Sequence, residues 1–197
     1  MIQISIALPS GRSEAFKFLQ SSKVGDLRIL AQKSFQRGFL RLVDAEHGMV
    51  DPAVSLQSAG LQDGDNLTAI VIHPKVAATA RAFALFCSGG NRVVTWGEPG
   101  YGGDSSEVQD QLKGVQQIQA THTAFAAILA DGLVVTWGDP DYGGDSSEVQ
   151  DQPKGVQQVQ ATDYAFAAIL ADGSVVTLGN PGYGGDTSAI ADQFAYV

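Results

Sequence analysis

The sequence predicts two domains: an α+β N-terminal domain, and a mainly-β C-terminal domain of about two and a half to three 41-residue β-hairpin repeats with short helices. Three observations predict this. Isoleucine and leucine occupy every second position over residues 2–8, as in a strand with one buried face. Residues 125–132 recur unchanged at 166–173. Charge divides the chain, because residues 1–78 hold 8 Lys/Arg and 7 Asp/Glu, whereas residues 79–197 hold 4 and 14.

The change in charge coincides with a stretch of small residues, which is typical of a domain boundary. We therefore expect a first domain over residues 1–75 and a linker over residues 76–82. A short acidic β-repeat domain that resembles an incomplete propeller is expected over residues 83–197.

The first domain is expected to begin with a hairpin, continue with a helix and end with two or three strands. The helix is indicated by apolar residues at helical spacing from Val24 to Phe35, with Ser21 or Ser22 as its cap and Gly38 as its end. The expected strands are residues 2–8, 15–19, 39–43, 49–50 and 66–72.

This order of elements is that of the β-grasp fold, and the segment resembles the ubiquitin-like family. The resemblance depends on Val24-Gly25-Asp26-Leu27, on Arg41-Leu42-Val43 and above all on residues 56–67. It implies an apolar patch on the sheet that binds protein partners, with Val43 and Ile70 at two of its positions. His73-Pro74-Lys75 follows where conjugated modifiers carry Gly-Gly, which favours a built-in domain. The alternative is that Val43 and Ile70 pack against a neighbouring domain.

Each repeat of the second domain is expected to be a hairpin followed by a loop, a short helix and a further strand. In the copy that starts at Phe125, Ala130-Asp131-Gly132 joins an uninterrupted apolar strand to a strand that ends in Trp137-Gly138. A loop with the sequence Pro-x-Tyr-Gly-Gly-Asp follows each hairpin. In the first copy, a short helix is predicted from Asp104 to Lys113.

This pattern is similar to the repeats of the regulator of chromosome condensation family, which also occur in HECT-type ubiquitin ligases. The shared features are the small apolar strand, Asp-Gly, the strand that ends in Trp-Gly and the Tyr-Gly loop. About two and a half copies are too few for the seven-bladed propeller of that family. We expect a compact domain of three hairpins, closed with threefold pseudosymmetry, and the alternative is one open sheet with a free edge.

Tyrosines and aspartates recur with the repeats and are the candidate partner-binding residues of the second domain. They are Tyr101, Tyr142, Tyr183, Asp104, Asp145 and Asp186. Aromatic residues dominate protein-binding hot spots. The alternative is that these tyrosines brace their own loops, and that Trp96 and Trp137 fill the repeat core.

Composition excludes several other classes of function. A net charge of −9 argues against nucleic acid and anionic membranes as partners, and no apolar run is long enough to insert into a membrane. The carboxylates Asp139, Asp141 and Asp145 have spacing similar to that of a calcium loop, but a structural turn is the favoured interpretation. Cys87 has no base and orienting group beside it in the sequence. We expect no cofactor, no metal and no catalytic residue.

The sequence therefore predicts a non-enzymatic protein–protein interaction module, an adaptor or recruiting factor linked to the ubiquitin system. The expected partners are proteins, either ubiquitin-pathway components or a large assembly. One alternative is a structural accessory subunit of a large assembly, and another is a fragment of a longer ubiquitin ligase. A single cysteine and an N-terminal segment that begins as a strand favour an intracellular, cytoplasmic location, with the nucleus left open.

Overall fold

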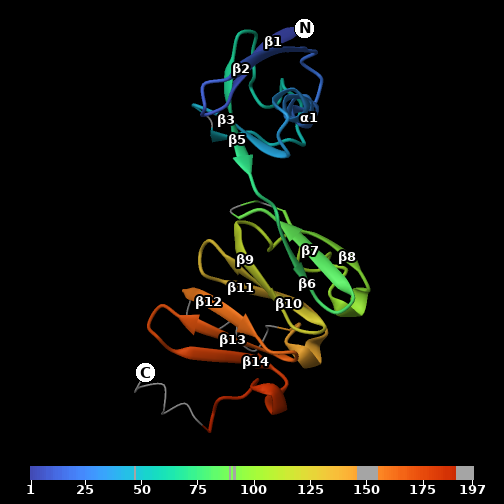
Figure 1. The fold of residues 1–197 in the computed structure, drawn as a ribbon, viewed down its shortest axis with the longest axis vertical. Coiled ribbons are helices and arrows are strands. Elements are labelled where there is room, and N and C mark those ends of the chain that lie inside the picture. The colour runs from blue at the N-terminus through green and yellow to red at the C-terminus, as the bar shows by residue number, and fades with distance from the viewer. Residues whose placement is uncertain (47, 89, 91, 146–154, 190–197) are drawn as a thin grey trace. The chain divides into compact units, whose positions relative to one another are not determined.

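The computed structural model describes residues 1–46, 48–88, 90, 92–145 and 155–189. Within these residues the protein is mainly β, with one α-helix and four small sheets (Figure 1). The chain divides into two compact units, Met1–His73 and Pro74–Val197. They are called the first and second units below.

The first unit consists of a mixed sheet and one helix. Its elements are β1 (Ile2–Ala7), β2 (Ser13–Phe18), α1 (Val24–Phe35), β3 (Phe39–Asp44), β4 (Gly48–Met49) and β5 (Asn66–Ile72). The strand order is β2-β1-β5-β3-β4. Strand β1 runs parallel to β5, and the other neighbours are antiparallel. The last strand, β5, therefore lies at the centre of the sheet, between β1 of the N-terminal hairpin and β3.

Alternation of side chains gives this sheet one buried and one open face. Ile2, Ile4 and Ile6 of β1 are buried together with Leu27 and Phe35 of α1. The intervening residues of each strand point away from the helix, because successive side chains of a strand alternate between faces.

The helix spans the predicted apolar pattern, Val24–Phe35, but its capping residues are other than those predicted. Lys23, rather than Ser21 or Ser22, is the N-cap, and its backbone N–H donates to the Asp26 carboxylate over 3.3 Å. The helix ends at Phe35 because Gln36 adopts a left-handed conformation with φ 54°, so Gly38 is not needed to end it.

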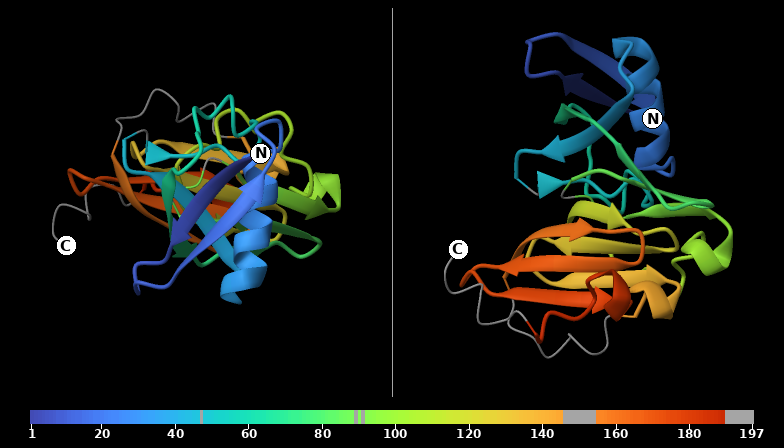
Figure 2. Two further views of the ribbon diagram at one scale, coloured as in Figure 1. Left: turned by 90° about the horizontal axis from the view of Figure 1, so that it is seen from above. Right: turned by 60° about the horizontal axis from the view of Figure 1, so that its bottom comes forward.

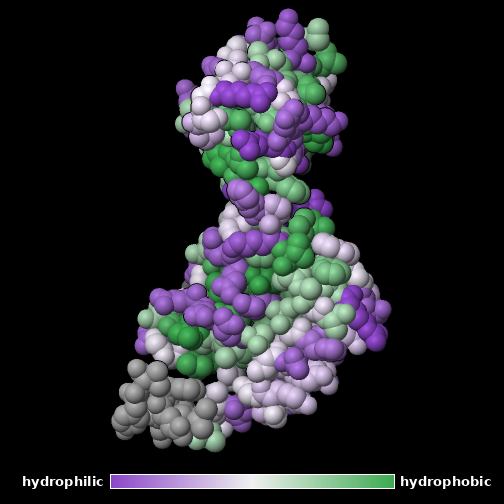
Figure 3. Space-filling view, viewed as in Figure 1, coloured by the Kyte–Doolittle hydropathy of each residue, from purple (hydrophilic) through white to green (hydrophobic). Residues whose placement is uncertain are grey.

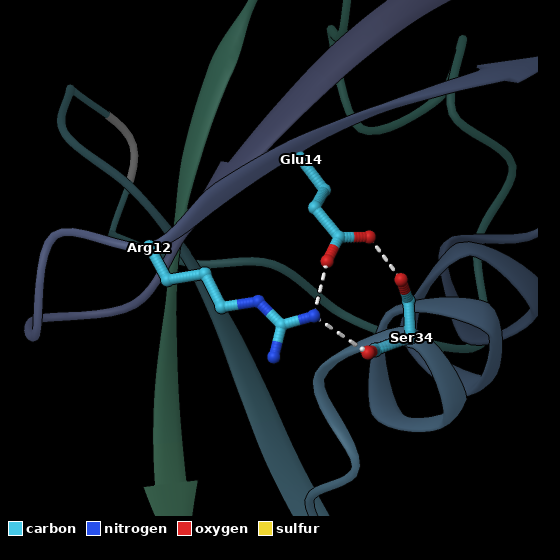
Figure 4. A network of polar contacts seen from close by, with 3 residues as sticks. All are labelled: Arg12, Glu14 and Ser34. Atoms are coloured by element: carbon cyan, nitrogen blue, oxygen red, sulfur yellow. Dashed lines mark hydrogen bonds and ion pairs between the residues drawn. The ribbon is translucent and has the colours of Figure 1, made fainter.

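A polar network connects the hairpin to the last turn of α1 (Figure 4). Arg12 Nη2 donates to Glu14 Oε1 over 2.6 Å and to the Ser34 carbonyl over 3.0 Å. Ser34 Oγ donates to the other oxygen of the Glu14 carboxylate. The hydrogen bond from Ser34 has the largest effect on the pKa of Glu14, followed by that from Arg12, and both lower it.

The described residues of the second unit form three antiparallel sheets of three strands each. The first sheet contains β6 (Lys75–Ala78), β7 (Ala82–Phe86) and β8 (Val94–Gly97), and the second contains β9 (Val115–Ala120), β10 (Ala124–Leu129) and β11 (Val134–Gly138). The third contains β12 (Val156–Ala161), β13 (Ala165–Leu170) and β14 (Val175–Gly179). The 3-10 turns η1 (Pro99–Tyr101), η2 (Pro140–Tyr142) and η4 (Pro181–Tyr183) follow β8, β11 and β14.

The structure corrects the predicted linker. Strand β6 and the first residue of β7 lie within the stretch predicted as linker, residues 76–82. Here β6 pairs with β7 from Lys75↔Phe86 to Ala78↔Phe83. The small side chains in this stretch are thus those of a strand rather than those of a spacer.

In the described part of the second unit, the hairpins form neither one open sheet nor a barrel closed by hydrogen bonds between hairpins. Each is the core of a separate sheet, and the sheets follow one another as layers (Figure 2). The central strands pair in matching register, with Phe83 opposite Trp96, Phe125 opposite Trp137 and Phe166 opposite Leu178.

Two apolar clusters hold the layers together. The first joins side chains of β7 with those of β9, β10 and β11, and the second joins β10 with β12 and β13. Strand β10 is buried on both faces, which explains its uninterrupted apolar sequence.

The short helix predicted from Asp104 to Lys113 is absent, and this segment forms successive turns. Ser105 is buried, and its hydroxyl lies 3.1 Å from the Thr95 hydroxyl. Leu112 is buried in the first apolar cluster. These two anchors hold the segment against the sheets. The matching segment of the next copy lies outside the described residues.

Candidate protein-docking surfaces

The structure brings Val43 and Ile70 to the same open face of the first sheet. In the β3–β5 pair, Arg41 lies opposite Ile70 and Val43 lies opposite Thr68. Residues directly opposite each other share a face, so Val43 and Ile70 are diagonal neighbours. Val43 is half-buried and Ile70 is exposed.

Two further apolar residues extend this surface, and sequence reasoning missed both. Phe39 is exposed and lies opposite Ile72, and Met49 is exposed and lies opposite Val43. We call Phe39, Val43, Met49 and Ile70 the sheet face. Figure 3 shows apolar side chains at the surface over β3 and β5. The sequence could have revealed Phe39, because alternate residues of a strand share a face and Phe39 lies four positions before Val43 in β3.

The three candidate tyrosines occupy equivalent positions in the second unit. Each is the last residue of a 3-10 turn, and its carbonyl accepts a hydrogen bond from a threonine hydroxyl. The pairs are Thr79 with Tyr101 (2.9 Å), Thr121 with Tyr142 (3.4 Å) and Thr162 with Tyr183 (3.0 Å). Thr79 lies in the predicted linker, so the first copy of the pattern begins earlier than the sequence analysis placed it.

Other aromatic side chains lie between these tyrosines and connect them into one row. His122 lies 6.1 Å from Tyr101 and 5.7 Å from Tyr164, measured between ring centroids. Tyr164 in turn lies 4.8 Å from Tyr142 and 4.6 Å from Tyr183. We call these five residues the aromatic row. Tyr183 is exposed, and Tyr101 and Tyr142 are half-buried.

Arg81 extends the aromatic row at one end. Its guanidinium lies 4.9 Å from the Tyr101 ring centroid, a cation–π distance. Sequence reasoning missed Arg81, His122 and Tyr164, because none of them recurs with the repeat. A row of aromatic rings that ends in a guanidinium has the side-chain types that are enriched in protein interfaces.

The candidate aspartates Asp104 and Asp186 hold their own loops. Asp104 accepts a hydrogen bond from the Ser106 N–H over 2.9 Å, and Asp186 accepts one from the Ser188 N–H over 2.8 Å. These backbone hydrogen bonds are the main cause of the lowered pKa of both carboxyls. Asp145 and Asp186 also line one polar groove beside β14.

Paired glycines fix the loop that carries each tyrosine. Gly102 has φ 83°, and a Cβ built there would lie 2.6 Å from the Phe125 ring. A Cβ on Gly103 would lie 2.5 Å from the backbone of Gly97. The Gly102 carbonyl also accepts a hydrogen bond from Trp137 Nε1 over 3.0 Å. The tyrosine loop of one sheet is therefore packed against the aromatic pair of the next sheet.

The described residues hold no cluster of His, Cys, Asp or Glu able to bind a metal ion. Asp139 accepts a hydrogen bond from the Asp141 N–H over 3.1 Å, as expected of a structural turn. Trp137 is buried in the first apolar cluster, whereas Trp96 is exposed. In the part of the chain that the structure describes, no helix has the length and apolar character needed to span a membrane.

Comparisons with known proteins found partial similarities only among solved structures. No family model matches the sequence, and no curated protein matches it. One similar structure is a computationally designed protein based on the template of human erythrocytic ubiquitin, at 20% identity and a TM-score of 0.33, covering 36% of this chain and 91% of that one. Another is ATBAG1 in complex with HSP70, at 15% identity and a TM-score of 0.33, covering 36% of this chain and 40% of that one.

Proposed function

We propose that this chain is a non-enzymatic interaction protein that recruits ubiquitin-system proteins through its first unit. In this proposal the first unit is a ubiquitin-like β-grasp domain. The second unit consists of repeats similar to those of the regulator of chromosome condensation family. The strand order β2-β1-β5-β3-β4 around α1 supports the first interpretation. The matching register of the three hairpins supports the second.

The observation that carries the proposal is the sheet face. Single exposed apolar residues are ordinary, but several of them gathered on one face mark an interaction surface. Phe39, Met49 and Ile70 are all exposed, and Arg41 lies directly opposite Ile70. Aromatic residues, Met and Arg are the types that protein interfaces favour.

The test is affinity capture from native extract with the full chain, read by mass spectrometry. Ile70→Asp places a carboxylate on the sheet face, and Ile29→Asp is a matched control on α1, since the two isoleucines are 42% and 48% exposed. We expect Ile70→Asp to reduce capture of ubiquitin-pathway proteins about tenfold or more, and Ile29→Asp to leave it unchanged. Equal capture by both variants would remove the sheet face from the proposal. A capture list without ubiquitin-pathway proteins would refute the link to that system.

A second candidate function is that of a structural accessory subunit in a large assembly. The exposed stacked pair Phe83 and Trp96 on the first sheet of the second unit favours it. Native mass measurements separate the two functions. A subunit is recovered only within an assembly of constant composition, whereas an adaptor is also recovered free.

A further inference from the structure

Each junction between neighbouring sheets in the second unit is made by the same two kinds of face. One sheet contributes the small side chains of its central strand and the first glycine of its tyrosine loop. The next sheet contributes a phenylalanine. At the first junction Phe125 packs with Ala82 and Ala84 and against Gly102. We call the side formed by Ala82, Ala84 and Gly102, and its equivalent in the other sheets, the receiving face. We call the side that carries Phe125, and its equivalent in the other sheets, the aromatic face.

The second junction repeats this arrangement. Phe166 packs with Ala124, Ala126 and Ile128. A Cβ on Gly143 would lie 2.7 Å from the Phe166 ring, almost the same approach as that between Gly102 and Phe125. The fit is therefore a property of the sheets themselves and not of one pair of them.

The first sheet presents an aromatic face that no other sheet in the described part of the second unit covers. Phe83 and Trp96 stack at 5.3 Å between ring centroids with an interplanar angle of 21°. The buried pair Phe125 and Trp137 stacks at 5.1 Å and 24°. Yet Phe83 and Trp96 are 44% and 46% exposed, against 0% and 4% for the buried pair. Figure 3 shows apolar side chains at the surface over β7 of this sheet.

The third sheet presents the matching receiving face at the other end of the row of sheets. Gly184 has φ 94°, close to the φ of Gly143, but a Cβ built there would meet no described residue within 4 Å. Ile169 is exposed, although Ile128, the equivalent residue of β10, is buried under Phe166. Among the described residues, nothing fills this receiving site for a phenylalanine on the third sheet.

We propose that a second copy of this chain fills that site, so that the protein associates head to tail. Phe83 of one copy packs on Gly184 and Ile169 of the other, and the Trp96 indole N–H donates to the Gly184 carbonyl as Trp137 does to Gly102. The occupant is a second copy because both halves of the internal junction stand open on one chain. Repeat proteins stay soluble when their end repeats carry polar outer faces, whereas the first sheet ends in the exposed aromatic pair Phe83 and Trp96. Such a contact joins two different faces, so it can extend beyond a dimer.

The test is sedimentation velocity of the full chain from about 1 µM to about 500 µM, a range that covers weak to moderate self-association. We expect the average mass of the wild type to rise with concentration. Trp96→Arg blocks the aromatic face and Ile169→Arg blocks the receiving face, so each variant alone stays monomeric. Mixed in equal amounts, the two variants retain one intact face of each kind and form a dimer that grows no further.

Glycine variants provide a second, independent measurement. Gly184→Ala adds a methyl group at the receiving face, and Gly173→Ala is its matched control, since both glycines have positive φ and open space around them. We expect the dissociation constant of self-association to rise about tenfold or more for the first and to stay unchanged for the second. A wild type that is monomeric at every concentration would overturn the proposal. So would a mixture of Trp96→Arg and Ile169→Arg that stays monomeric while the wild type associates.

Discussion

The packing of sheets in the second unit predicts that two equivalent phenylalanines contribute very differently to its stability. Phe125→Ala removes a fully buried ring from the first apolar cluster, which costs about 3–5 kcal/mol. Phe83→Ala removes a ring that is only about half-buried, which costs about 1 kcal/mol of burial and up to about 1 kcal/mol of stacking. The difference between the two variants is therefore about 1–4 kcal/mol.

Urea unfolding followed by tryptophan fluorescence measures this difference in the second unit, because both tryptophans of the chain lie there. Measurement at low protein concentration keeps self-association out of the comparison. With a urea dependence of about 2 kcal/mol/M, the midpoint of Phe125→Ala is expected about 0.5–2 M below that of Phe83→Ala. Equal midpoints would refute the conclusion that the junction between the first two sheets stabilises the unit.

Three further predictions concern the loops. Gly102→Ala is expected to destabilise the second unit more than Gly184→Ala does, because only the first places a Cβ against an aromatic ring, and urea midpoints compare the two. Thr121→Val is expected to cost about 1–2 kcal/mol, since the buried Ala124 N–H loses its 2.9 Å hydrogen bond to the threonine, and equal stability of the variant and the wild type would contradict this. Two hydrogen bonds from Ser174 lower the pKa of Asp172, and the bond from the serine hydroxyl has the larger effect. These bonds therefore stabilise the folded protein fully above the ordinary pKa of 3.8. Their contribution is lost as the pH falls towards the lower pKa that Asp172 has in the folded state. Urea midpoints between about pH 6 and pH 3 should therefore fall less for Asp172→Asn than for the wild type, and parallel curves would contradict the assignment.

Local patterns in the sequence predicted the strands well. The alternation from Ile2 to Leu8 and the apolar run from Phe125 to Leu129 each correspond to a strand, because side-chain periodicity reports which faces are buried. The N-cap of the helix was harder to predict, since the Asp26 carboxylate in the first turn accepts the hydrogen bond from the backbone N–H of Lys23.

The extent of the first repeat and the aromatic row could not be predicted in the same way. Strand β6 has few large side chains, and the turn after it contains Thr79, whose hydroxyl donates to the Tyr101 carbonyl in a distant loop. His122 and Tyr164 come together with the tyrosines only because the sheets are layered. Contacts between layers leave no periodic signal in the sequence.

The central claim is that this chain acts by docking a protein partner on the sheet face of its first unit. Its most direct test is a series of amide NMR spectra of the full chain during titration with a purified partner obtained by affinity capture. We expect chemical-shift changes to concentrate on β3, β4 and β5 around Val43 and Ile70. Changes concentrated on α1, with the sheet face unaltered, would contradict it.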